Sequence, residues 1–198
     1  MPGAAAVVEA VDRVTMTPEE LDQLGDFLQR DVPEVLQLDL TFELENAAAP
    51  SITIRFSIPL LWGVFQAMHR GGIHETSLLA IFGHLIFQHL EHAGVDDELI
   101  AFQSIWVDMG HMFRLDVNRW DNDEDLAISF SYCLLSERLI SRRNAAAIAP
   151  FLVTEEEPPE GWDSLADTIS ADAWRLKVDR WAARHKLDPV GIRQRRPK

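Results

Sequence analysis

Two neighbouring stretches in which apolar and polar residues strictly alternate constrain the fold of this chain more than any other feature. In residues 36–45, LQLDLTFELE, every second side chain is leucine or phenylalanine. Residues 52–58, ITIRFSI, repeat the alternation after a turn-forming break at 46–50. A period of two places the apolar side chains of a strand on one face. The pattern therefore predicts an antiparallel hairpin with one buried face and one wet face.

Helical patterns lie on both sides of this hairpin. At residues 17–20, TPEE, a capping residue, a proline and two acids predict the start of a helix. A short helix is expected at about 60–69, closed by a glycine pair, and a longer one at about 75–92. Further helices are expected at about 137–151 and 164–187.

The middle of the chain predicts additional strands. Residues 99–107 fit a helix or a strand on local pattern, and we favour a strand. Residues 111–118 and 125–133 are rich in strand-forming side chains, and the acidic segment 121–125 would join them as a hairpin. The expected fold class is therefore α+β, an antiparallel sheet of about five strands packed by helices, with a helical C-terminal tail.

Length and charge suggest one domain with an appendage. The 198 residues are 47% hydrophobic, enough for one core, and the net charge is −14. The last 24 residues alone carry +7, so the residues before them carry −21. We expect an acidic α+β domain at 1–153, an acidic proline-containing linker at 154–161 and a basic helical tail at 162–198. Nucleic acid is an unlikely partner for the acidic part and would have to meet the tail.

The chain shows no sign of export or membrane insertion. Cys133 is the single cysteine, which excludes an intramolecular disulfide. No apolar run reaches the length of a membrane span, and the first residues lack the pattern of a signal peptide. We therefore expect a soluble cytoplasmic protein.

Six of the seven histidines lie between His69 and His111, which raises the question of a ligand site. A glycine-containing loop between two predicted helices gathers several polar groups there. Its candidate ligand-binding residues are His69, Arg70, His74 and Glu75. Amide N–H groups, the guanidinium and protonated histidine together suit an anion. A plain helix-to-helix turn is the simpler explanation.

Motifs for metals, cofactors and catalysis are missing. A helical zinc pair needs ligands four residues apart, and Gln88 stands four residues after His84. Leu126 occupies the position where a calcium loop beginning at Asp121 needs glycine. No phosphate loop, dinucleotide fingerprint or nucleophile elbow occurs. We expect no metal, no cofactor and no catalytic residue, and we lean against an enzyme.

The tail carries the strongest interaction signal. Trp174, Val178, Trp181 and His185 share one helical face, because they follow one another at i, i+4, i+7 and i+11. Basic residues, among them Arg180 and Arg184, surround this stripe. Two tryptophans on one stripe require a cover, either the protein's own body or a groove on a partner.

These features favour a non-enzymatic protein-interaction module, such as an adaptor, inhibitor or immunity-type protein. Its acidic body would meet a partner with a basic surface, and its tail would enter a hydrophobic groove or fold back as a regulatory latch. The alternative is a small hydrolase or anionic-ligand-binding protein that uses the loop from His69 to Glu75. A third hypothesis is a homo-oligomer joined through open strand edges.

Overall fold

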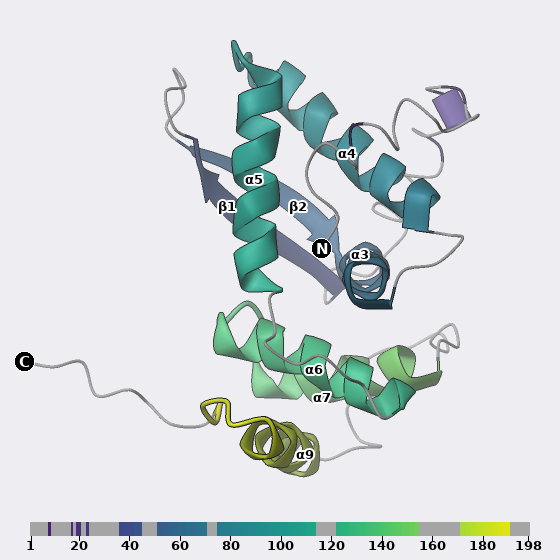
Figure 1. The fold of residues 1–198 in the computed structure, drawn as a ribbon, viewed down its shortest axis with the longest axis vertical. Helices are drawn as coiled ribbons and strands as arrows, with labels where there is room; N and C mark the ends of the chain where they lie inside the picture. The colour runs from purple at the N-terminus through teal and green to yellow at the C-terminus, as the bar shows by residue number, and fades with distance from the viewer. Residues whose placement is uncertain are drawn as a thin grey trace, which may run out of the picture. The chain divides into compact units, whose positions relative to one another are not determined.

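A computed structural model describes residues 36–44, 51–70, 75–113, 122–154 and 171–190, together with positions 8, 17, 19, 20 and 23 (Figure 1). The chain divides into two compact units, Met1–Arg114 and Leu115–Lys198, and each is described by itself. Apart from its first residue, the expected linker at 154–161 lies outside the described residues. Most of the helix expected after Thr17 does too.

One local signal near the start of the chain is nevertheless visible. The N–H of Thr17 donates to Oε2 of Glu20 at 2.8 Å, and the N–H of Glu20 donates to Oγ1 of Thr17 at 3.3 Å. This reciprocal exchange is a capping box, the arrangement that satisfies two exposed amide groups at a helix N-terminus.

The predicted hairpin is confirmed. β1, Gln37–Glu43, pairs antiparallel with β2, Ser51–Ser57, and Leu40 lies opposite Ile54. The inner face is buried, and its members are Leu38, Leu40, Phe42, Ile52, Ile54 and Phe56. On the outer face Arg55 donates to both carboxylate oxygens of Asp39, at 2.7 and 3.0 Å. The period of two thus separates a core face from a polar face, as expected.

Three helices complete the first unit. They are α3, Ile58–Arg70; α4, Glu75–His92; and α5, Glu98–Met112. The predicted helices at 60–69 and 75–92 are confirmed. Phe82 of α4 stacks on Phe56 of β2 at 5.4 Å between ring centroids and meets Trp106 of α5 edge-on at 5.8 Å. These aromatic contacts join the inner face of the hairpin to two of the helices that cover it.

The expected sheet of about five strands is wrong. Within the described residues the sheet has two strands, and the chain is mostly helical. Residues 99–107 belong to α5, and residues 125–133 belong to α6, Asp123–Ser136. Residues 111 and 112 end α5, while 114–118 lie outside the described residues.

Capping residues explain why these segments are helices. Oδ1 of Asp97 accepts from the N–H of Ile100 at 3.1 Å, at the start of α5. Oδ1 of Asn122 accepts from the N–H of Asp125 at 2.9 Å, and three acids fill the first turn of α6. The acidic segment that resembles a hairpin turn is therefore a helix N-terminus, where side-chain oxygens and negative charge are stabilising.

The second unit consists of α6 with α7, Arg142–Thr154, and α9, Ala171–Arg184. Arg138, with φ of 60°, turns the chain between α6 and α7, and the hydroxyl of Ser141 accepts from the N–H of Asn144 to cap α7. The helix expected at 137–151 therefore begins later, and it continues past Pro150. α9 packs on both α6 and α7.

Removing the cap of α6 tests the corrected assignment. We expect Asn122→Ala to lower the free energy of unfolding by about 1 kcal/mol, because the Asp125 amide loses its acceptor. Asn122→Ser, which retains a capping oxygen, is the control and should cost little. Urea unfolding followed by circular dichroism measures both, and an equal loss in the two variants would contradict the capping role.

Candidate binding groove

The first candidate residue of the loop, His69, turns into the protein. Its Nε2–H donates to the carbonyl oxygen of Phe113 at 3.0 Å, and its ring lies 4.4 Å from that of Phe65. Burial lowers the pKa of His69 below its usual value, against the opposing effect of this hydrogen bond. Burial therefore disfavours protonation of this imidazole, which packs at the end of α5.

The rest of the loop is not described. His74 lies outside the described residues, as do the side chains of Arg70 and Glu75. His111 is exposed near the end of α5, two residues before the carbonyl that His69 contacts. A ligand site at these residues stays a prediction.

Two of the three histidines of α4, His89 and His92, bond to their own helix. Nδ1–H of His89 donates to the carbonyl of Leu85 at 2.8 Å, and Nδ1–H of His92 donates to that of Gln88 at 2.7 Å. In the part of the chain that the structure describes, no three histidine, cysteine, aspartate or glutamate residues gather in a way that would hold a metal ion.

The tryptophan stripe of the tail lies inside the second unit. Trp174 and Trp181 are each 1% exposed and Val178 is fully buried, on a helix that packs against α6 and α7. Nε1–H of Trp174 donates to the hydroxyl of Ser131 in α6 at 3.3 Å. His185 closes the stripe against Trp181, with ring centroids 4.7 Å apart. Trp174, Val178 and Trp181 form core, whereas His185 is half-buried, and a role of these side chains in binding a partner stays a prediction.

The basic residues of α9 meet the acids of α6. Nη2–H of Arg184 donates to Oδ1 of the buried Asp125 at 2.9 Å, and Lys177 forms an ion pair with Glu124. Arg180 is exposed. Part of the positive charge predicted to face a partner is thus used within this unit.

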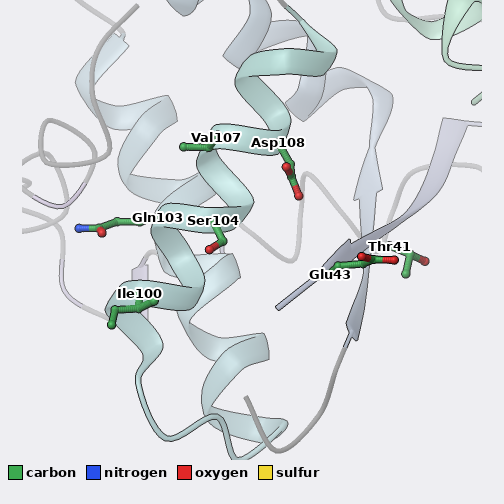
Figure 2. Close-up of a pocket in the computed structure, with 7 residues that line it drawn as sticks. All are labelled: Thr41, Glu43, Ile100, Gln103, Ser104, Val107 and Asp108. Atoms are coloured by element: carbon green, nitrogen blue, oxygen red, sulfur yellow. The ribbon is translucent and has the colours of Figure 1, made fainter. Parts of the chain in front are cut away.

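An open groove of about 620 Å³ lies between β1 and α5 in the first unit (Figure 2). It is lined by Thr41, Glu43, Ile100, Gln103, Ser104, Val107 and Asp108. Figure 2 shows the side chain of Asp108 extending to the side of α5 on which the strand with Thr41 and Glu43 lies, whereas Ile100, Gln103 and Val107 extend to the other side. The groove therefore has a helical wall and a strand wall.

The groove combines exposed apolar surface with negative charge. Ile100 and Val107 on α5 are 50% and 53% exposed, and Leu99 beside them is 48% exposed. Glu43 and Asp108 are exposed and make no ion pair with any residue that the structure describes. Large aliphatic side chains beside unpaired carboxylates suit a ligand that has both apolar and basic groups.

Sequence reasoning missed this groove because it assigned residues 99–107 to a strand. Once the segment is a helix, its buried members follow the helical period, and they are Ala101, Phe102, Ile105, Trp106 and Met109. Ile100 and Val107 then fall off the buried stripe. Their apolar character at exposed helical positions was the available signal.

Comparison with known proteins identifies no relative, since no family description, no curated protein and no solved structure matches the chain. Among the described helices, none has both the length and the apolar character needed to cross a membrane.

The environment of His69 predicts a loss of stability in acid. The unfolded chain binds a proton near the ordinary pKa of 6.5, whereas folded His69 resists protonation until lower pH. Its contribution is thus complete above pH 6.5 and is lost as pH falls through the folded pKa. Urea unfolding across this range should show a weaker pH dependence for His69→Gln. The exposed His92→Gln serves as control, and equal slopes in all three proteins would refute the assignment.

The burial of the tryptophan stripe predicts a large structural effect. We expect Trp174→Ala to lower the free energy of unfolding by about 3–5 kcal/mol, because it empties a core position. Leu176→Ala on the same helix removes a side chain that is 45% exposed and should cost about 0.5 kcal/mol. Denaturant unfolding compares the two, and similar small losses would show that the stripe is not core.

Proposed function

We propose that this protein is a non-enzymatic protein-interaction module that binds its partner in the groove between β1 and α5. The observation that carries the proposal is the exposure of Ile100 and Val107 on a helix whose opposite face is core. Covering the exposed half of each side chain is worth about 1 kcal/mol. A bound partner would remove these two side chains from water.

Charge supports a basic partner. The protein carries a net charge of −14, and two carboxylates, Glu43 and Asp108, line the groove itself. Opposite charge on a partner accelerates encounter and orients it, and the effect declines as salt screens the field. An adaptor, inhibitor or immunity-type protein with a cytoplasmic basic target fits these properties.

The rival role has less support. A hydrolase or anion-binding site at the loop from His69 to Glu75 would use the ring of His69, yet its Nε2–H already donates to the Phe113 carbonyl, and burial lowers its pKa, which disfavours the charged form that would bind an anion. Likewise, Trp174 and Trp181 are already covered by α6 and α7, so these two side chains have little apolar surface left for a partner.

The test is partner capture with matched variants of the full chain. We expect the double variant Ile100→Lys/Val107→Lys to lose a partner that the unaltered protein retains from its native lysate, because two positive charges replace apolar side chains in the wall that meets the basic partner. Leu176→Lys places the same charge at a comparably exposed position of the second unit and should retain the partner. Circular dichroism establishes that all three are folded.

A partner retained equally by the double variant would refute the groove as the binding site. If no partner is captured by any of the three proteins, the interaction role itself fails, and the loop at His69 becomes the site to screen with anionic ligands.

A further inference from the structure

Within the described part of the chain, the strand wall of the groove has one edge without a partner strand. β1 pairs with β2 on one side, and α3 and α4 pack on β2 whereas α5 packs on β1. Thr41 and Glu43 of β1 line the groove together with residues of α5, and no residue of β2 does, which places the groove beside the edge of β1 that faces away from β2. Among the described residues no further strand pairs with β1. In an antiparallel ribbon, every second residue of a strand points its N–H and C=O toward the outer edge.

Resting on the proposed function, we propose that the groove binds an extended basic segment of the partner, which adds to the outer edge of β1 as a third strand. Main-chain hydrogen bonds to β1 would hold this segment, and side chains at alternate positions would determine which sequences fit. The bound segment is thus a basic strand on an acidic edge and not a helix lying in the groove.

The dimensions suit an extended segment. Ile100 and Val107 are two helical turns apart, about 10 Å along α5, a span that about three strand residues cover. Alternate side chains of a strand point the same way, so apolar residues at such positions can pack on α5. The intervening residues would face the polar side of the hairpin.

The charges distinguish between possible occupants. Glu43 belongs to the strand wall and Asp108 to the helical wall, so lysine or arginine on the added strand meets a carboxylate on either side. Asp39, four residues before Glu43 in β1, already pairs with Arg55 of β2. Glu43 is therefore the acid of this strand that a cation on the added segment would meet.

A second copy of this chain is a poorer occupant. The sequence of β1, QLDLTFE, contains two acids and no lysine or arginine. Pairing β1 with its own copy would bring carboxylates together, and like charges on adjacent strands are destabilising. The edge therefore favours a foreign basic strand over self-association.

The experiment uses the full-length protein and synthetic peptides long enough to span β1. One peptide alternates valine and lysine, a second alternates valine and glutamate, and a third is an amphipathic leucine–lysine helix. Two further versions of the valine–lysine peptide carry N-methyl groups on one or the other set of alternate residues, because methylation removes the donors on a single edge. Calorimetry gives the affinities, and amide hydrogen exchange by NMR locates the site.

We expect the valine–lysine peptide to bind and to protect alternate amides of β1. The valine–glutamate peptide should bind at least about tenfold more weakly, a difference of about 1.4 kcal/mol. One N-methylated version should lose binding by a similar factor while the other retains it. The double variant Ile100→Lys/Val107→Lys should bind the valine–lysine peptide more weakly than Leu176→Lys does.

Other outcomes overturn the inference and separate it from the proposed function. If the helical peptide binds best, or if neither methylated version weakens binding, the groove holds a helix, and the proposed function survives without strand addition. If no peptide binds in the groove, strand addition by a basic segment is refuted, and partner capture alone decides the proposed function. Self-association that protects the β1 amides would identify a second copy as the occupant.

Discussion

The burial of one face of a two-stranded hairpin is the constraint on which the first unit depends. A hairpin of this size has too little buried surface to be stable alone, so its six apolar side chains need helices over them. Phe82 provides the link, since it stacks on Phe56 and meets Trp106 edge-on. Because α5 joins the core through Trp106, its opposite face is turned outward beside β1. The groove follows from this arrangement.

The second unit buries its apolar side chains with helices alone, among the residues that the structure describes. α9 buries Trp174 and Trp181 against α6 and α7, and its arginine and lysine side chains pair with acids at the start of α6. The desolvated carboxylate of Asp125 gains a partner in Arg184, which offsets the cost of its burial. The tryptophans that suggest an interaction surface in the sequence are thus buried by the protein's own packing, while three of the large apolar side chains that stay exposed, Leu99, Ile100 and Val107, belong to α5.

Prediction succeeded where one periodicity was unambiguous and failed where burial hid it. The hairpin and the helices α3 and α4 were predictable from alternation, glycine and proline. α6 was not, because residues 125–131 and 133–135 are all buried, so no helical stripe distinguishes it from a strand. Its capping residue Asn122 and the acids after it carried the correct signal, but the same residue types also form turns.

The sequence by itself determined the hairpin and its wet face, the acidic charge and the exclusion of an intramolecular disulfide, since each depends only on local order or composition. Tertiary structure decided which face of α5 is exposed, that burial lowers the pKa of His69, and that the tryptophans of α9 are core. These properties depend on which distant side chains remove each group from water. Burial is a property of the folded assembly of elements, and no short window of sequence contains it.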